Sequence, residues 1–257
     1  MDLFERVKRA CAKQAARFSD AKSNRANERY IRWILDSLPA APGGEALDVA
    51  AGTGILSRAL AGRFARVTAI DLSVDMLQQG RFETERAGIG NLAFAEGNAE
   101  RLPFADGSFD LVMSRFAFHH FPDPAAVLRE MGRVCREAGT VAVVDIVAPD
   151  DPELKRSYNR YERLRDPSHA EALGRAELAA LFREAGLAVE IAEGIDVPVD
   201  FDRWIRLTGT DERTAEEIRF DLEAELAGGP PTGMRPFVQD GRLHFTHAYC
   251  KVIARKT

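Results

Sequence analysis

The clearest chemical signal in the sequence is a turn rich in small residues between Leu47 and Ser57. Within it, Gly52 and Gly54 let the backbone turn tightly and approach a ligand with no side chain in the way. The helix predicted to follow presents unpaired N–H groups at its amino terminus. Further along, a second predicted strand ends at Asp71, whose carboxylate can accept hydrogen bonds from ribose hydroxyls. These features together predict a site for a nucleotide-like ligand.

The glycine spacing alone does not identify that ligand. Gly52-x-Gly54-x-x-Ser57 is also close to the fingerprint of nicotinamide dinucleotide sites, which leaves a reductase as a rival interpretation. Asp48 separates the two, because it stands where a dinucleotide places its negative pyrophosphate and S-adenosylmethionine (SAM) its cationic methionine moiety. A carboxylate disfavours the first ligand and suits the second. The alternative role for Asp48 is to cap amides near the strand end.

Several segments together resemble the class I methyltransferases. Leu47 to Gly54 is similar to their first motif, and Asp71 to the acidic end of their second strand. Gly97 to Asp110 and Ser114 to Pro124 resemble the subgroup that includes the ubiquinone and menaquinone C-methyltransferases. The resemblance implies a Rossmann-like α/β fold with a mostly parallel seven-stranded sheet. It also implies SAM as the cofactor, with S-adenosylhomocysteine (SAH) as its product.

The resemblance further assigns cofactor contacts. Asn98 would bond the adenine amino group through its side-chain amide, and Ala99 would offer backbone atoms. Leu72 and Met76 would flank the adenine, with ordinary core packing as the alternative. Arg115 would touch the methionine end or a covering loop, with surface solvation as the alternative. The expected cofactor-binding residues are thus Asp48, Ala50, Gly52, Thr53, Gly54, Asp71, Leu72, Met76, Asn98, Ala99 and Arg115.

Two positions depart from the family pattern. Ala50 stands where the first motif usually has a glycine, so we expect that part of the turn to adopt backbone angles that a Cβ tolerates. The turn Arg136-Glu137-Ala138-Gly139 replaces the usual Pro-Gly-Gly before the fifth strand. We expect this second change to bear on stability rather than on chemistry.

His119 and His120 are the candidate catalytic residues. They follow the fourth predicted strand, on the side where this fold holds its methyl donor. Because SAM already carries an activated methyl group, an in-line displacement chiefly needs a positioned nucleophile and exclusion of water. A general base helps if the acceptor must lose a proton from a hydroxyl or an activated carbon. The alternative is that either histidine is structural and bonded to the backbone.

No metal site is expected. His244 and His247 lie three residues apart in the last predicted strand, and therefore on opposite faces. His169 stands in a covering segment, where it would line the acceptor pocket or serve only as a loop residue. The 3 cysteines are too scattered for a zinc site, and no cluster of carboxylates and histidines suits a metal.

Short β-rich runs alternate with helical stretches along the chain, which predicts a mostly parallel sheet with helices on both faces. Strands are expected at 46–50, 67–70, 92–95, 109–113, 140–147, 187–192 and 243–254. Two helices are expected before the first strand. We expect one methyltransferase domain over residues 1–257, with an N-terminal helical lid at 1–40, a SAM-binding core at 41–150, and covering segments at 151–172 and 196–241.

The covering segments contain five aromatic residues that could form an apolar acceptor pocket. They are Tyr158, Tyr161, Phe201, Trp204 and Phe220. The alternative is that these rings only pack helices against the sheet. The predicted reaction is methyl transfer to carbon or oxygen of a small organic acceptor, such as a quinone, aromatic or polyketide-like molecule. The alternative function is a non-methylating activity, such as cyclisation, or an accessory role on the same fold.

The composition narrows the partners. A net charge of −5 gives no basic footprint for a phosphate backbone, so no nucleic-acid partner is expected. No apolar stretch approaches the roughly 20 residues that span a bilayer. The first residues also lack the pattern of a signal peptide, which predicts a cytoplasmic protein. We expect a monomer or homodimer whose partner is a small-molecule acceptor.

Overall fold

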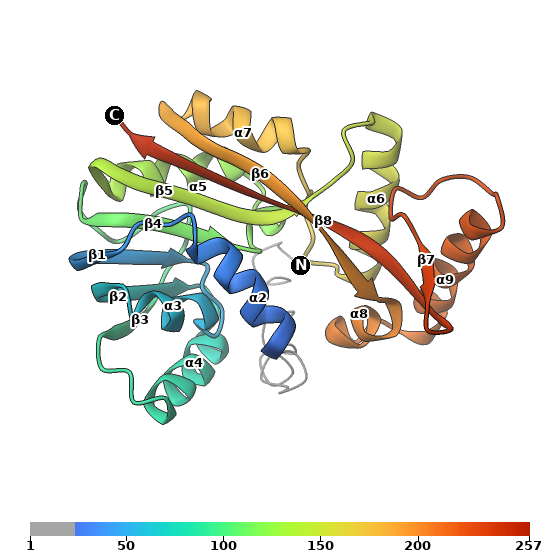
Figure 1. Ribbon diagram of the computed structural model, residues 1–257, viewed down its shortest axis with the longest axis horizontal. Helices are drawn as coiled ribbons and strands as arrows, with labels where there is room; N and C mark the ends of the chain where they lie inside the picture. The colour runs from blue at the N-terminus through green and yellow to red at the C-terminus, as the bar shows by residue number, and fades with distance from the viewer. Residues whose placement is uncertain (1–23) are drawn as a thin grey trace.

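A central sheet with helices on both faces organises residues 24–257, the part of the chain that the computed structural model describes (Figure 1). Seven strands follow the order β3-β2-β1-β4-β5-β8-β6, and the short β7 pairs with β8 beside this path. The strands are β1 (Ala41–Val49), β2 (Phe64–Asp71), β3 (Leu92–Glu96), β4 (Phe109–Arg115), β5 (Cys135–Val147), β6 (Leu187–Asp200), β7 (Phe237–Gln239) and β8 (Arg242–Lys256). The predicted seven-stranded sheet is confirmed, and β7 is an addition to it.

The strands that carry the predicted site are parallel. β1 pairs with β2 and β4, and β4 pairs with β5, so the carboxyl ends of these strands meet at one edge of the sheet. β8 runs antiparallel between β5 and β6. Residues 111–114 of β4 and 139–147 of β5 are buried without interruption, as expected of strands covered on both faces.

The helices around the sheet divide between its two faces. They are α2 (Asn24–Leu35), α3 (Ile55–Leu60), α4 (Val74–Arg86), α5 (Pro124–Val134) and α7 (Arg175–Glu184). Ile34 of α2 and Leu56 of α3 belong to one apolar cluster. Leu128 of α5 and Phe182 of α7 belong to the cluster on the other face. α4 packs against β2 and β3.

The N-terminal prediction can be followed only from residue 24 onward. α2 confirms a helix before β1, and its residue Ile34 is buried in the apolar cluster beneath it. Lys251 of β8 fixes the end of this helix, because its Nζ donates to the carbonyl of Trp33 at 2.9 Å and to Oγ of Ser37 at 2.6 Å. Residues 1–23, which include most of the expected lid, lie outside the described residues.

A cover of three helices stands beyond the carboxyl end of β5 (Figure 1). It consists of α6 (Pro152–Arg165), α8 (Phe201–Thr208), α9 (Glu212–Leu226) and β7, together with the outer ends of β6 and β8. The ladder of β6 and β8 continues past β5 as far as the pair Asp200 and His244. The first residues of the expected covering segment 196–241 therefore belong to the sheet, because β8 offers them a partner strand.

Four of the five aromatic residues expected to line an acceptor pocket are packed inside the cover. Tyr158, Tyr161, Phe201 and Trp204 are at most 4% exposed and share one apolar cluster, whereas Phe220 is 72% exposed. The prediction of an apolar pocket formed by all five is wrong. The four buried rings pack together and hold α6 and α8 against the sheet.

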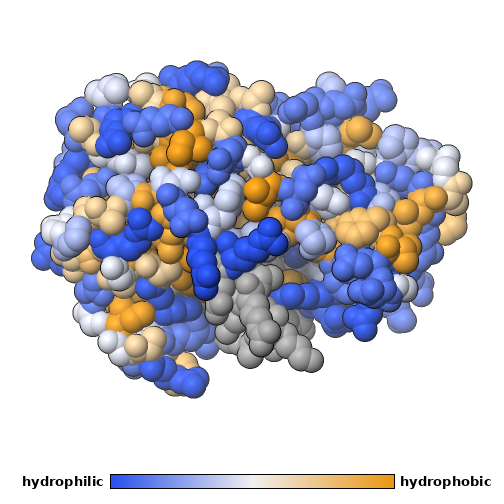
Figure 2. Space-filling view, viewed as in Figure 1, coloured by the Kyte–Doolittle hydropathy of each residue, from blue (hydrophilic) through white to orange (hydrophobic). Residues whose placement is uncertain are grey.

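The face of the molecule in Figure 2 is mostly hydrophilic, and its hydrophobic side chains form small, separate areas. One of these areas lies over the region of α9 and β7, whose exposed hydrophobic residues include Phe220, Leu226 and Val238. Between residues 24 and 257, no helix is both long and apolar enough to cross a membrane.

Candidate active site

The turn after β1 leaves open space beside Gly52. Gly52 and Gly54 both have left-handed φ angles, of 57° and 71°. A Cβ on Gly52 would meet no atom within 4 Å, whereas one on Gly54 would approach the ring of Phe94 at 2.9 Å. Glycine at position 54 is therefore required by packing against Phe94. The backbone of Gly52 instead borders space that a ligand can occupy.

Ala50 adopts the conformation of the glycine that it replaces. Its φ of 54° lies in the left-handed region, which is allowed for a residue with a Cβ but uncommon, so the expected tolerance comes at a cost in strain. The turn imposes this conformation through its hydrogen bonds. The N–H of Ala51 donates to the carbonyl of Ile70 on β2, and that of Gly54 donates to Ala51, both at 3.0 Å. A side chain in this region costs about 1–2 kcal/mol, which the surrounding structure outweighs.

Asp71 ties the turn to the end of β2. Its Oδ2 accepts a hydrogen bond from the N–H of Gly52 at 2.7 Å, and its Oδ1 accepts one from Ser73 at 2.8 Å. Burial raises the pKa of Asp71, opposed by these backbone hydrogen bonds. The carboxylate that the sequence assigned to the ribose is therefore next to the open side of Gly52.

Asp48 is buried at the carboxyl end of β1 and is held by Ser57. Its Oδ2 accepts a hydrogen bond from the Ser57 hydroxyl at 2.6 Å. Burial raises the pKa of Asp48 to about 6, against the opposing effects of the Ser57 hydrogen bond and the charge of Arg115. The guanidinium of Arg115 lies over the ring of Phe116 at 4.8 Å. Ser57, which made the glycine motif look like a dinucleotide fingerprint, is thus the partner of the carboxylate.

The residues predicted to surround the adenine lie at the next strand ends. β2 and β3 are parallel, with Asp71 opposite Glu96, so the loop after β3 begins beside Asp71. In that loop, Oδ1 of Asn98 accepts a hydrogen bond from the N–H of Glu100 at 2.9 Å. Met76 is buried at 4% exposure, and its packing matches the alternative considered for it. Leu72 is partly exposed and Ala99 is buried.

His119 and Asp145 form a dyad at the ends of β4 and β5. Nδ1 of His119 lies 2.6 Å from Oδ1 of Asp145, and the backbone N–H of His119 donates to Oδ2 at 3.0 Å. Burial acts to lower the pKa of His119, but the charge and the hydrogen bond of Asp145 outweigh it, and the pKa is raised. Because Asp145 occupies Nδ1, Nε2 is the ring nitrogen that can exchange a proton with a substrate.

The rings of His120 and His169 lie beside this dyad, tilted against that of His119, but are held differently. The ring of His119 lies 4.1 Å from that of His120 and 5.4 Å from that of His169. Nδ1 of His120 contacts the carbonyl of Ser168 at 3.0 Å, and Nε2 of His169 contacts Oδ1 of Asn159 at 2.7 Å. Burial and the neighbouring charge of His119 lower the pKa of His120 to about 4 and that of His169 to about 3. These two rings therefore stay neutral at pH 7.

Comparison with known proteins identifies the family. A family model described as a methyltransferase domain matches residues 47–143. An uncharacterized methyltransferase of Bacillus subtilis, YcgJ, is 34% identical over 172 residues, which are 67% of this chain and 68% of the relative. A demethylmenaquinone methyltransferase of Geobacillus kaustophilus is 33% identical over 207 residues, 71% of this chain and 88% of the relative. The chain belongs to the SAM-dependent methyltransferase family.

The fold of this methyltransferase agrees with that assignment. The solved structure of the YcgJ protein superimposes with a TM-score of 0.81 at 27% identity, covering 89% of this chain and 98% of that chain. The site residues expected from the sequence gather at the carboxyl ends of β1, β2, β3 and β4, where ligands bind in open parallel sheets. Among the residues described, no group of histidine, cysteine and carboxylate side chains could hold a metal ion.

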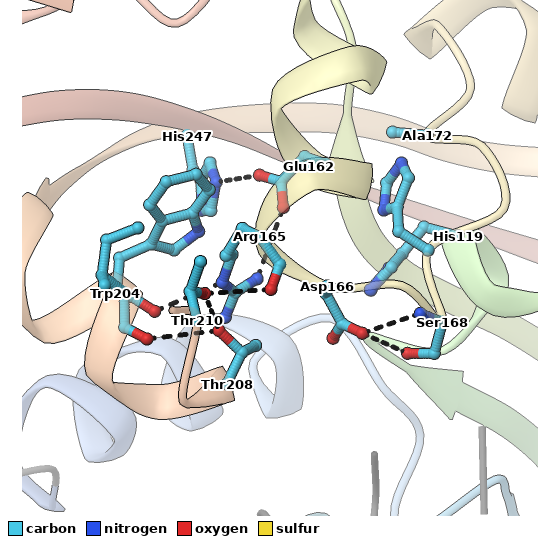
Figure 3. Close-up of polar contacts among 12 residues, drawn as sticks. His119, Glu162, Arg165, Asp166, Ser168, Ala172, Trp204, Thr208, Thr210 and His247 are labelled. Carbon is cyan, nitrogen blue, oxygen red and sulfur yellow. Dashed lines mark hydrogen bonds and ion pairs between the residues drawn. The ribbon is translucent and has the colours of Figure 1, made fainter. Parts of the chain in front are cut away.

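Two histidines of this methyltransferase have acidic partners that were not predicted from the sequence, Asp145 and Glu162. Asp145 lies within a run interpreted only as a buried strand, although a charged residue there was itself a signal. Oε1 of the buried Glu162 lies 2.8 Å from Nε2 of His247, and Oε2 lies 3.3 Å from Arg165 (Figure 3). His244 stacks on Phe237 of β7, whereas His247 is buried beneath the cover. The two side chains therefore lie on opposite faces of β8, as the sequence predicted.

Proposed function

We propose that the protein binds SAM at the turn after β1 and transfers its methyl group to carbon or oxygen of a small organic acceptor. The observation that carries this proposal is the buried carboxylate of Asp48. It is hydrogen-bonded to Ser57, in the same turn that leaves open space beside Gly52. A negative pyrophosphate would be repelled there, whereas a cationic methionine moiety would be attracted. The residues present therefore fit SAM.

Each end of the cofactor has a counterpart among the site residues. Asp48 and Arg115 supply opposite charges close enough to interact, which suits the ammonium and carboxylate of the methionine moiety. Asp71 would exchange its bond from Gly52 for ribose hydroxyls. Asn98, Ala99 and Leu72 would contact the adenine. The bound cofactor supplies a methyl group on a sulfonium, which needs no covalent help from the protein.

His119 is the general base of the proposed reaction. Asp145 fixes the orientation of its ring, so that Nε2 accepts the proton that a hydroxyl or activated carbon loses. His120 is bonded to the backbone of Ser168 and serves to position the stacked rings. A relative named for demethylmenaquinone supports a hydroxylated aromatic or quinol as the acceptor class.

Binding and transfer are tested separately. Calorimetry should show that SAH binds and NADH does not, and that Asp71→Ala weakens SAH at least tenfold. Asp75→Ala removes an exposed carboxylate from the first turn of α4. It is the matched control and should leave the affinity unchanged. Labelled SAM incubated with a metabolite extract should give a labelled small product. Tight SAH binding with no transfer to the extract or to quinols would instead support a non-methylating role.

A further inference from the structure

Two buried donors in the cover have no hydrogen-bond partner. They are the hydroxyl of Tyr158 on α6 and the indole Nε1 of Trp204 on α8, and each residue is only 2% exposed. Buried polar groups in folded proteins are nearly always paired, because an unpaired one loses its bond to water and gains nothing. Two such groups on neighbouring elements therefore indicate a missing partner.

Both donors flank the same side chain. The ring of His247 on β8 lies 6.2 Å from that of Tyr158 and 6.5 Å from that of Trp204. His247 cannot be the missing partner through Nε2, which is bonded to Glu162 at 2.8 Å. Figure 3 shows the indole of Trp204 beneath His247, beside the side chains of Glu162 and Arg165. The polar side chains that surround the two unpaired donors already have hydrogen-bond partners of their own.

The charged side chains of this region already have partners within the protein. Arg165 contacts Glu162 at 3.3 Å, donates from Nε to the carbonyl of Trp204 at 3.2 Å, and lies over the indole at 5.0 Å. Burial opposes ionisation of Glu162, but the hydrogen bond of His247 and the charges of His247 and Arg165 hold its pKa well below the usual value. The groups left unpaired are neutral donors, and the carboxylates of Glu162 and Asp145 that act on Tyr158 would repel an anion, so an uncharged acceptor oxygen fits them best.

The region also adjoins the His119 dyad. Burial, followed by the charges of Glu162, Tyr249 and Asp145, raises the pKa of Tyr158 well above its usual value. The hydroxyl is therefore protonated and able to donate, and it lies within electrostatic range of the carboxylate that holds His119. Tyr249 connects the same region to the end of β4, because its ring lies 6.2 Å from that of His247 and 4.7 Å from that of Phe116.

We infer that Tyr158 and Trp204 hold an uncharged oxygen of the methyl acceptor, while the carbon or oxygen to be methylated faces His119. This inference rests on the proposed function. It specifies the acceptor as a neutral molecule with an oxo or hydroxyl group set apart from the reacting atom. Tyr158 and Trp204 are then specificity-determining residues, which recognise the acceptor and take no part in proton transfer.

The first experiment uses the protein without ligand. Tyr158→Phe removes only an unpaired hydroxyl, so the thermal unfolding midpoint should stay the same or rise. Tyr161→Phe is the matched control on the same helix, because its hydroxyl donates to Asp221 at 2.9 Å, and its midpoint should fall. A fall for Tyr158→Phe as large as that for Tyr161→Phe would show that the hydroxyl has a partner within the protein, and would overturn the inference.

The second experiment compares two probes of one shape, 1-tetralone and tetralin, which differ by a carbonyl oxygen. With SAH bound, ligand-observed NMR should show that the wild type prefers 1-tetralone by about tenfold, the effect of one buried hydrogen bond. Tyr158→Phe should weaken that preference, because only the Trp204 donor remains, and Tyr161→Phe should keep it in full. SAH binding with no such preference, or with one that is undiminished in Tyr158→Phe, overturns this inference alone. Failure of SAH to bind overturns the proposed function instead.

Discussion

The carboxylate of Asp145 holds His119 at two points, with Oδ1 2.6 Å from the ring Nδ1 and Oδ2 3.0 Å from the backbone nitrogen. The double contact fixes both the position of the residue and the plane of its ring. It also leaves Nε2 as the basic nitrogen. Since the pKa of His119 is raised, the dyad is a stronger base than an isolated histidine, and it becomes available at a higher pH.

Replacing Asp145 should therefore change the pH profile of methyl transfer. The wild-type rate should rise with pH as His119 loses its proton, because only the neutral ring accepts a proton from the acceptor. Asp145→Asn removes the charge that raises the pKa of His119, so this rise should move to lower pH. The plateau of kcat should fall by about 10²-fold, since the ring is no longer held in one tautomer.

A matched substitution controls for the loss of a carboxylate near the site. Asp123→Asn changes an exposed cap at the start of α5, whose Oδ1 accepts a hydrogen bond from Ala126, and asparagine caps helices equally well. Its pH profile should match the wild type. An Asp145→Asn profile that keeps its midpoint would show that the dyad does not govern the reaction.

Removing the imidazole should separate catalysis from cofactor binding. His119→Asn should lower kcat by about 10²-fold or more, because a general base typically contributes that much. The Kd for SAH should stay within about twofold, since no part of the proposed cofactor site involves this ring. Single-turnover rates together with SAH calorimetry make the comparison. A loss of SAH affinity as large as the loss of rate would mean that His119 serves the cofactor.

The two glycines of the turn should respond in opposite ways to alanine. Gly52→Ala places a methyl group in the space proposed for the ligand and should weaken SAH at least tenfold. Gly54→Ala brings Cβ to 2.9 Å from Phe94, so it should chiefly lower the free energy of unfolding, by about 2 kcal/mol or more. Calorimetry and urea denaturation measure the two effects. Full SAH affinity in Gly52→Ala would place the cofactor elsewhere.

Ala50 offers a substitution that should stabilise the protein. Its left-handed φ of 54° suits glycine, so Ala50→Gly should raise the free energy of unfolding. The gain should be about 0.5–1 kcal/mol after the greater entropy of an unfolded glycine is subtracted. Ala51→Gly, at the next residue, has no positive φ to relieve and should be destabilising. A destabilised Ala50→Gly would show that the methyl group of Ala50 contributes packing that outweighs its strain.

Features that depend on neighbouring residues could be predicted from the sequence. The strands contain short β-rich runs, and the turn from Asp48 to Gly54 combines a strand end, two glycines and a helix start within a short segment. Ser57 shows the limit of such local patterns. Its spacing from the glycines favoured a dinucleotide site, whereas its hydroxyl bonds the carboxylate that disfavours one.

Pairs that depend on the register of distant strands could not be predicted. His119 and Asp145 stand 26 positions apart, and they meet only because β4 and β5 are parallel neighbours that end together. Glu162 and His247 are 85 positions apart and meet because β8 continues beyond β5 into the cover. In the sequence, Glu162 stands among several other charged residues, and its residue type alone does not mark it as buried. The aromatic residues of the cover were misjudged for the same reason, since packing partners decide which rings are buried.

The titration of Asp48 gives the last prediction. Its pKa of about 6 exceeds that of an ordinary carboxyl group, so its burial should lower the stability of the fold as the pH rises from about 4 to about 6, with no further change above that range. A cationic methionine moiety favours the ionised form, so SAH binding should release a proton near pH 5–6. Wild-type affinity should fall by up to about tenfold between pH 7 and pH 5.

Asp48→Asn should bind SAH at least tenfold more weakly at pH 7 and approach the wild type at pH 5. Calorimetry in two buffers of different ionisation enthalpy counts the released protons. Binding that is independent of pH in the wild type would mean that Asp48 does not face the charged end of the cofactor.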